Sequence, residues 1–324
     1  MNFSWNNLDK PILALAPMAG YTDSAYRQLI KSLAPETVVF SEFVSSDAIK
    51  FKSKKTFQML KFDPAEQPLV VQIFGKNPTH FAEAARVLES LGVAAVDINM
   101  GCPAKKVVSS DHGSALFKNP KLAREIMEAT VQAVKIPVSV KMRVGTADDS
   151  ECIDFAVMAE ESGAQLVSIH GRTVKQMYTG LAAYDAIYKV KERLSIPVIG
   201  NGDVTSVAAW DERIGNLDGL MVGRGTVGNP WLMAELVAHI RGEEYKKPET
   251  LAERLPVIMR HAELMVQVKG EQRGMIEMRK FLAGYVKGEA GASKVRQNLV
   301  RVETLEEAHE LLTGFIAELK KETL

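Results

Sequence analysis

Cysteine is scarce in this 324-residue sequence, net charge is zero, and no apolar run is long. The two cysteines, Cys102 and Cys152, can form neither a disulfide framework nor a CxxC zinc site, so we expect a reduced, cytoplasmic protein. Without an HExxH motif or a carboxylate cluster, we expect no metal. The apolar run 11–20 is too short to cross a bilayer, and the first ten residues lack the features of a signal peptide, so we expect no membrane role.

The charge balance is equally informative, because forty Lys and Arg residues match forty Asp and Glu residues. Indiscriminate coating of nucleic acid depends on summed positive charge, so this balance excludes that class of protein. Local basic patches remain possible, because screening confines the reach of a charge to about 8 Å. Three segments are basic: the lysine run 50–61, residues 103–124, and residues 269–301, which hold eight bases and three acids.

Eight short, nearly continuous apolar runs alternate with helical patterns, which predicts parallel strands buried on both faces. A doubly wound sheet is the alternative, but it rarely reaches eight strands in strict alternation. We therefore predict an α/β fold, a (β/α)8 TIM barrel, over residues 1–242. The connection 45–60 is the least regular. The runs are 12–16, 37–43, 69–74, 94–99, 137–142, 166–170, 197–200 and 219–222.

The strand signal stops near residue 225, and a charged linker covers residues 241–248. The remainder predicts a small all-α C-terminal domain over residues 243–324. One predicted helix, 272–287, places Met278, Phe281, Leu282 and Tyr285 on a single face. A second, 304–321, begins with a capping box that Thr304 opens.

Polar side chains recur at the carboxyl ends of the predicted strands, where barrels of this type carry their working residues. Such groups are costly in buried strands unless they bind something, so their convergence predicts an open polar site. They are Gln72, Asp97, Asn99, Lys141, Arg143, His170, Arg172, Asn201, Asp203 and Arg224.

Glycine pairs follow the last two predicted strands, at Gly200 and Gly202 and at Gly223 and Gly225. These loops are the usual phosphate position of the barrel, and Arg224 could pair with a phosphate there. Plain turns are the alternative. Residues 223–228 also spell G-x-G-x-x-G, but a helix and the linker follow, so we reject a dinucleotide fingerprint.

Cys102 lies just past a predicted strand, where its thiol would face the barrel mouth. A thiol of ordinary pKa is mostly protonated at neutral pH and can act as an acid, whereas a nucleophile needs a lowered pKa. Lys105, Lys106 and His112 could lower that pKa, so both roles stay open, as does an inert packing role. Inert packing is what we expect for Cys152.

Lys141 is predicted to point into the same mouth. A cation there would stabilise the negative charge that a reduced flavin carries around N1 and O2. Gln72 and Asn201 could hydrogen-bond the polar edge of the flavin ring. An ion pair between Lys141 and an inner carboxylate such as Asp97 is the alternative.

The motifs at the predicted strand ends and in the loops after them together resemble the tRNA-dihydrouridine synthases, most closely their bacterial B-type branch. They run through the barrel in the order of the family, and the C-terminal region matches in size and helical character. Asp111-His112 departs from the small or apolar residues expected before Gly113. The motifs are Pro17-Met-Ala, Asp97-Ile-Asn-Met-Gly-Cys-Pro-Ala-Lys-Lys-Val107, Gly113-Ser-Ala, Lys141-Met-Arg-Val-Gly145, His170-Gly-Arg-Thr173, Asn201-Gly-Asp203 and Gly223-Arg224.

The resemblance implies an FMN enzyme that reduces the C5=C6 bond of a uridine in tRNA, expected in the D-loop, with NADPH or NADH as reductant. It implies that Cys102 donates the proton to C5 after hydride reaches C6, which favours the acid over the nucleophile. The implied FMN contacts are Pro17, Met18, Ala19, Gln72, Lys141, His170, Asn201, Gly202, Asp203, Gly223 and Arg224. The implied substrate contacts are Asn99, Arg143, Arg172, Lys105, Lys280 and Lys287.

A uridine inside folded tRNA is stacked and must be turned out to reach a flavin. Phosphate contacts around the mouth are therefore required, and the three basic segments are the candidates for them. We expect tRNA and NADPH as partners of a monomeric protein.

Three other functions fit parts of the pattern. An FMN barrel acting on a free pyrimidine would not need the basic helical tail. A sugar-phosphate isomerase or synthase would carry no flavin, so flavin absorbance would exclude it. A tRNA-binding folding factor without redox chemistry would need neither Cys102 nor Lys141.

Overall fold

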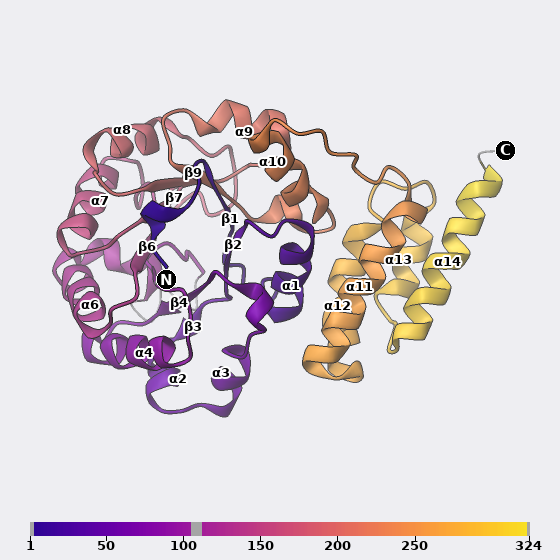
Figure 1. Ribbon diagram of the computed structural model, residues 1–324, viewed down its shortest axis with the longest axis horizontal. Coiled ribbons are helices and arrows are strands. Elements are labelled where there is room, and N and C mark those ends of the chain that lie inside the picture. The colour runs from indigo at the N-terminus through magenta and orange to yellow at the C-terminus, as the bar shows by residue number, and fades with distance from the viewer. Residues whose placement is uncertain (1–2, 105–111, 323–324) are drawn as a thin grey trace. The chain divides into compact units, whose positions relative to one another are not determined.

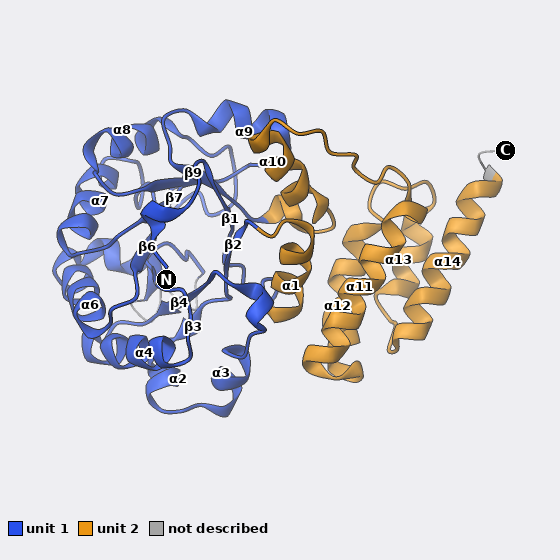
Figure 2. Cartoon of the chain, viewed as in Figure 1, with its two compact units in different colours: residues 1–23, 36–223 blue, residues 24–35, 224–324 orange. Residues whose placement is uncertain are grey.

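The structure is a computed structural model that describes residues 3–104 and 112–322. It divides into two compact units (Figure 2). The first comprises residues 1–23 and 36–223, and the second comprises residues 24–35 and 224–324. These units do not coincide with the predicted domains 1–242 and 243–324, which stay a prediction.

The first unit contains a parallel barrel (Figure 1). Pairing of β1 with β9, at Leu13 and Leu220, and of β2 with β4, at Val39 and Leu69, closes eight strands into a ring. This closure confirms the predicted barrel and excludes the doubly wound sheet. In the described ranges the strands are β1 (Ile12–Leu15), β2 (Val38–Phe40), β3 (Val44–Ser45), β4 (Leu69–Phe74), β5 (Ala95–Asn99), β6 (Val138–Arg143), β7 (Val167–His170), β8 (Val198–Asn201) and β9 (Gly219–Val222).

The strand β3 differs from the sequence prediction. It pairs with the carboxyl end of β4, where Val44 lies opposite Ile73, and it stands outside the ring of eight. The predicted run 37–43 forms a strand over only three of its residues. A strand of two residues leaves no periodic pattern in a sequence, so β3, which lies where the run 37–43 meets the irregular connection 45–60, was not predicted.

Apolar side chains fill the amino-terminal part of the barrel interior. Side chains alternate along a strand, so Ile12, Ala14 and Ala16 share one face, and all three belong to a single buried cluster. Trp5, from the short 3-10 helix η1 (Trp5–Asn7), joins this cluster and stacks on Phe40 with ring centroids 6.3 Å apart. The amino-terminal part of the interior is therefore apolar, and the polar residues lie toward the carboxyl ends of the strands.

Helices surround these strands (Figure 1). Asn-Pro pairs begin two of them: Asn77 and Asn119 accept backbone N–H groups of the first turn, and the prolines follow at the first helical position. In the described part of this unit the helices are α2 (Ser46–Lys50), α3 (Lys54–Met59), α4 (Pro78–Ser90), α6 (Pro120–Ala133), α7 (Cys152–Glu161), α8 (Asp185–Arg193) and α9 (Val207–Ile214), with the 3-10 turns η2 (Pro64–Glu66) and η3 (Gly113–Lys118).

The second unit is helical in its described part. Met278, Phe281, Leu282 and Tyr285 are all buried, as their helical spacing predicts. Thr304 forms the predicted capping box, accepting the N–H of Glu307 and donating its own N–H to that carboxylate. The helices are α1 (Ser24–Leu33), α10 (Trp231–Arg241), α11 (Leu251–Lys269), α12 (Glu271–Tyr285), α13 (Ala292–Leu299) and α14 (Leu305–Glu322), with the 3-10 turn η4 (Arg224–Thr226).

Candidate active site

Most of the predicted site residues lie at the carboxyl ends of the barrel strands. Asn99 stands in register with Lys141, and His170 stands in register with Asn201, so neighbouring strands bring these side chains to one level. Arg224, Lys280 and Lys287 belong to the second unit, and Lys105 lies outside the described residues. Neighbouring strands of the first unit therefore bring the four side chains in register together, and the geometry below concerns that unit.

Lys141 provides a half-buried cation in the mouth of the barrel. Its Nζ donates to Asn201 Oδ1 at 2.9 Å, and Asn201 Nδ2 donates in turn to the carbonyl of Met221 at 2.7 Å. Burial lowers the pKa of Lys141 to about 8, although the charge of Asp97 opposes that shift. The ammonium binds the amide of Asn201 rather than Asp97, so the structure favours a positioned cation over a simple ion pair.

The predicted ring-edge ligand Gln72 is fully buried and tied to its neighbours. Its Nε2 donates to Asp97 Oδ2 at 2.7 Å, and its Oε1 accepts from Asn99 Nδ2 at 2.7 Å. Ser139 donates to the other oxygen of Asp97 at 2.6 Å. Burial raises the pKa of the Asp97 carboxyl to about 6, although the hydrogen bonds from Ser139 and Gln72 and the charge of Lys141 lower it.

The Cys102 loop is held from two sides. Asn99 Oδ1 accepts the backbone N–H of Cys102 at 3.0 Å, while Ser114 Oγ donates to the Cys102 carbonyl at 2.9 Å. Burial raises the pKa of the Cys102 thiol, and a backbone hydrogen bond from Ala104 and the charges of Arg143 and Lys141 only partly oppose it. The thiol is therefore protonated at neutral pH and keeps a proton to donate. Lys105, Lys106 and Asp111 of this loop lie outside the described residues.

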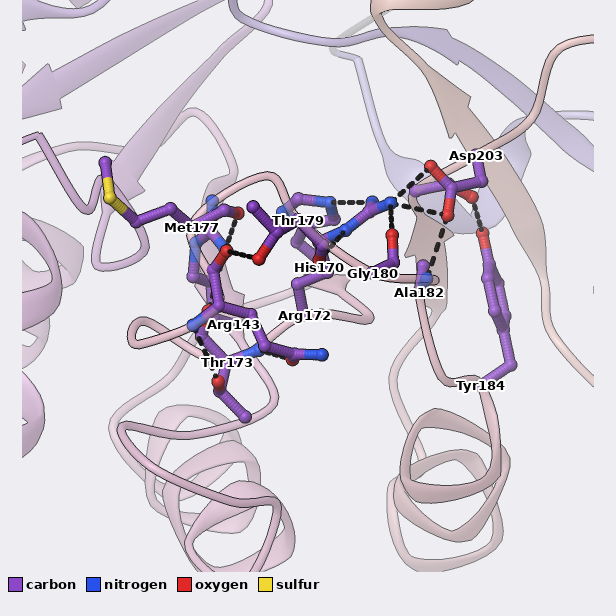
Figure 3. Close-up of polar contacts among 12 residues, drawn as sticks. Arg143, His170, Arg172, Thr173, Met177, Thr179, Gly180, Ala182, Tyr184 and Asp203 are labelled. Atoms are coloured by element: carbon purple, nitrogen blue, oxygen red, sulfur yellow. Dashed lines mark hydrogen bonds and ion pairs between the residues drawn. The ribbon is translucent and has the colours of Figure 1, made fainter.

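Arg143 ties the Cys102 loop to the loop after β7 (Figure 3). Its Nε donates to the Gly101 carbonyl at 2.9 Å, and its Nη1 donates to the carbonyls of Thr173 and Met177 at 2.9 and 2.7 Å. The guanidinium also lies 5.4 Å from the ring centroid of Tyr178, which is 53% exposed. Arg143 is only 2% exposed, so it supports the site mainly by bonding the backbone of these two loops.

Arg172 holds the far side of the same loop (Figure 3). Its Nη2 contacts both carboxylate oxygens of Asp203 at 2.8 Å and the Gly180 carbonyl at 2.6 Å. Its Nη1 lies 3.5 Å from His170 Nε2. With 2% of its surface exposed, Arg172 lies beneath His170 and Asp203, two of the predicted cofactor contacts.

The turn after β8 has an unusual backbone. Gly202 and Asp203 have φ values of 125° and 54°, and a Cβ at Gly202 would lie 2.6 Å from the Ala182 Cβ and 3.0 Å from the His170 ring. The turn therefore requires glycine, and the hydroxyl of Tyr184 donates to its carbonyl at 2.8 Å. Gly200, in contrast, is small for packing, because a Cβ there would lie 2.7 Å from Tyr184.

The segment after β1 lies beside the segment after β9. The Ala16 N–H donates to the Val222 carbonyl at 2.8 Å, and a Cβ at Gly223 would meet the Met18 sulfur at 3.4 Å. Thr22 Oγ1 fixes this segment by accepting the N–H of Met18 at 2.9 Å. The predicted contacts Pro17, Met18 and Ala19 thus share one part of the rim with Gly223.

The basic segments are partly neutralised. Lys50 pairs with Glu83, and Arg124 pairs with Glu161 at 2.8 Å. In the second unit, Lys269 and Arg273 pair with Glu277, and Arg279 donates to the carbonyls of Arg301 and Val302. The other bases of residues 269–301 form a set that we name the tail cluster, half-buried at Lys280 and exposed elsewhere: Lys280, Lys287, Lys294, Arg296 and Arg301.

Sequence reasoning missed four supporting residues: Ser139, Tyr178, Tyr184 and, except as a motif letter, Ser114. Ser139 and Ser114 act through single hydroxyl bonds, and Tyr184 acts on a backbone carbonyl. A serine or tyrosine is common in any strand or loop, so no spacing marks these roles. Only Ser114, inside a family motif, carried a usable signal.

Two features are absent from the described ranges, 3–104 and 112–322. No helix there combines the length and apolarity that a membrane crossing requires. No three His, Cys, Asp or Glu side chains of these ranges gather closely enough to hold a metal ion.

Comparison with known proteins gives a consistent result. The family model described as "Dihydrouridine synthase (Dus)" matches residues 14–322. The chain is 38% identical over 310 residues to a probable tRNA-dihydrouridine synthase 1 of Synechocystis, covering 94% of this chain and 86% of that one. It is 37% identical over 309 residues to tRNA-dihydrouridine synthase B of Pseudomonas aeruginosa, covering 94% and 93%.

Among solved structures, the histamine dehydrogenase of Rhizobium sp. 4-9 superposes with a TM-score of 0.54 at 15% sequence identity. The match covers 78% of this chain and 48% of that one. At this identity the likeness shows the barrel fold alone.

We predict that Arg172→Ala lowers the free energy of unfolding by about 3 kcal/mol, because it removes the buried guanidinium that pairs with Asp203 and bonds the Gly180 carbonyl. Urea denaturation measures this change, and amide hydrogen exchange should speed up over residues 173–183. Arg124→Ala, which removes an exposed ion pair, is the matched control and should change stability by less than about 0.5 kcal/mol. An Arg172 variant as stable as this control would contradict the role.

Proposed function

Because the chain belongs to the dihydrouridine synthase family, we propose that it reduces the C5=C6 bond of a uridine in tRNA, in the D-loop. The supporting observation is the juxtaposition of two groups at one barrel mouth. They are the Cys102 thiol, whose pKa burial raises, and the half-buried ammonium of Lys141, carried on the strand next to β5. An acid and a fixed cation are the two groups that reduction of an enone requires.

We propose FMN as the cofactor of this site, because the donor set fits its charge. Among the described residues the Lys141 ammonium donates one hydrogen bond, although it carries three donor hydrogens, so it can also donate to an anionic ring edge. Gln72 of β4, His170 of β7 and Asn201 of β8 are further proposed contacts. Pro17, Met18, Ala19, Gly202, Asp203, Gly223 and Arg224 complete the proposed FMN contacts. When bound, FMN would supply the hydride for C6, with NADPH or NADH as reductant.

Cys102 then supplies the proton for C5. The thiol is neutral at physiological pH and needs no base to prepare it. The hydrogen bond that the backbone N–H of Cys102 donates to Asn99 Oδ1 fixes where the residue lies. The charges of Arg143 and Lys141 stabilise the thiolate that remains after transfer. The thiol thus acts as a general acid, as the resemblance implies.

For tRNA we propose contacts through Lys105, Lys280 and Lys287 on the phosphates. Asn99 and Arg143, proposed from the sequence as contacts at the mouth, are better placed to hold the Cys102 loop. Arg172, proposed from the sequence as a further contact, is better placed to support Asp203 and His170. The tail cluster supplies the positive charge that a polyanion requires, although the whole chain is neutral. We propose a monomer that works in the cytoplasm on tRNA.

We predict that Cys102→Ala lowers dihydrouridine formation at least about 100-fold and leaves FMN bound, because only the proton donor is removed. Mass spectrometry of tRNA measures the product, and flavin absorbance measures the cofactor. Cys152→Ala is the control, since that thiol is buried in α7 with its pKa raised to about 12. Full activity of the Cys102 variant would refute the donor role.

We predict that FMN affinity falls as pH rises through about 8. The folded-state pKa of Lys141 is lowered, so the cation is present below that pH and lost above it. Fluorescence titration of the flavin-free protein from pH 7 to 9.5 measures the affinity. Lys141→Gln should bind about tenfold more weakly with a flat profile, while Lys189→Gln, on the exposed face of α8, should keep the wild-type profile. An unchanged profile in the Lys141 variant would exclude this cation.

We predict that Lys287→Glu with Lys294→Glu weakens tRNA binding at least tenfold at low salt and leaves flavin reduction by NADPH unchanged. The two lysines are exposed, whereas Lys280 is half-buried with its ammonium 5.3 Å from the ring centroid of Phe281. Filter binding against salt concentration provides the measurement. The control, Lys189→Glu with Arg193→Glu, changes the charge equally on α8. Equal loss in both pairs would reject a specific role for the tail cluster.

A further inference from the structure

A row of polar residues crosses the barrel beneath the candidate site. Gln72 of β4, Asp97 of β5 and Ser139 of β6 stand in register on three adjacent strands, and all three are 0% exposed. A buried carboxylate is costly unless hydrogen bonds compensate for its lost hydration. The burial of Asp97 in this row therefore points to a role beyond packing.

The hydrogen bonds of Asp97 lead to one place. Its Oδ2 accepts from Gln72 Nε2 at 2.7 Å, Gln72 Oε1 accepts from Asn99 Nδ2 at 2.7 Å, and Asn99 Oδ1 accepts the backbone N–H groups of Gly101 and Cys102 at 3.2 and 3.0 Å. We name this series the Asp97 relay. It connects a buried carboxylate with the backbone of Cys102.

The chemistry of both ends sets a single direction for this relay. The backbone N–H groups of Gly101 and Cys102 can only donate, so the oxygen of Asn99 must face them and its NH₂ must face Gln72. The NH₂ of Gln72 then needs an acceptor, which the Asp97 carboxylate provides. An amide turned the wrong way would place two donors or two acceptors against each other in a buried site.

Within residues 3–104 and 112–322, the Asp97 carboxylate accepts hydrogen bonds from Gln72 and Ser139. Lys141 donates to Asn201 instead of Asp97, and Ser139 takes only the second carboxylate oxygen. The burial that raises the pKa of Asp97 to about 6 leaves it ionised at neutral pH. A hydroxyl such as Ser139 can both donate and accept, so it tolerates either protonation state, whereas the amide of Gln72 needs an acceptor.

We propose that Asp97 is a positioning residue, which fixes the orientation of Gln72 and Asn99 and thereby the place of Cys102 in the barrel mouth. The proposal rests on the proposed function only in giving Cys102 the role of proton donor. What the relay requires at position 97 is an acceptor aimed at Gln72, not a negative charge. Asp97→Asn can supply it, with its amide oxygen toward Gln72 and its NH₂ toward Ser139 Oγ, whereas Asp97→Ala cannot.

The test measures the reactivity of the Cys102 thiol itself, so it needs neither tRNA nor turnover. Iodoacetamide alkylation of the purified full-length protein is followed by mass spectrometry of the Cys102 peptide, with the buried Cys152 as internal reference. We expect Asp97→Ala to speed alkylation of Cys102 at least fivefold at pH 7.5, because a released loop exposes the thiol and removes the burial that raises its pKa. Asp97→Asn and the control Ser139→Ala should stay within twofold of wild type.

A double-mutant cycle separates the relay from any effect of the Asp97 charge through space. In an Asn99→Ala background, where the relay is already broken, Asp97→Ala should add less than a twofold change. An Asp97→Ala protein that reacts at the wild-type rate, or one whose acceleration persists in the Asn99→Ala background, would overturn the proposal. If Asp97→Ala does not fold, Asp97→Ser, which fills part of the space without reaching Gln72, takes its place under the same expectations.

Dihydrouridine formation by the same variants distinguishes this proposal from the proposed function. We expect a loss of at least tenfold in kcat for Asp97→Ala and recovery to within threefold of wild type for Asp97→Asn. If Cys102→Ala keeps full activity while the alkylation pattern holds, the donor role fails and the relay stands. If Cys102→Ala is inactive while the alkylation rates do not respond to position 97, the relay fails and the donor role stands.

Discussion

Alternation of side chains along strands that close into a ring is the constraint on which the rest of the first unit depends. Every second residue must point inward, and the interior has a fixed width. Its amino-terminal part holds apolar side chains such as Ile12 and Ala14 around Trp5. Its carboxyl part holds Lys141 and Asp97, whose burial moves both pKa values toward neutrality. The closed barrel that excludes solvent from the core thus also shifts the pKa values of the charged groups at the carboxyl ends of its strands.

Two buried arginines connect the loops that follow the strands. Arg143 joins the Cys102 loop to the loop after β7, and Arg172 joins that same loop to Asp203. Guanidinium groups suit this work, because one side chain presents five donors in a rigid fork and several carbonyls can share it. The two arginines thereby hold the Cys102 loop and the loop after β7 at the mouth of the barrel, where we propose that the cofactor and the uridine bind.

Much of the fold followed from sequence, for physical reasons that particular elements illustrate. Continuous apolar runs predicted all eight strands of the ring, because a strand buried on both faces tolerates little else. The two-residue strand β3 left no such signal. For the site, the positions of Lys141, Asn201 and Cys102 at strand ends were predictable. The bonds of Arg143 and Arg172 were not, because their partners are mainly backbone carbonyls, which no residue type announces.

By itself the sequence determined the barrel, the helical character of the C-terminal region, the family and the residue types gathered at the strand ends, because periodicity and motif order are local properties of the chain. Tertiary structure decided which of those residues face one another. The direction of the Cys102 pKa shift depends on burial by segments far apart in sequence, and the alignment of Gln72, Asp97 and Ser139 depends on strand register. Which bases of residues 269–301 remain exposed likewise depends on pairing, since Glu277 neutralises Lys269 and Arg273 only in the folded chain.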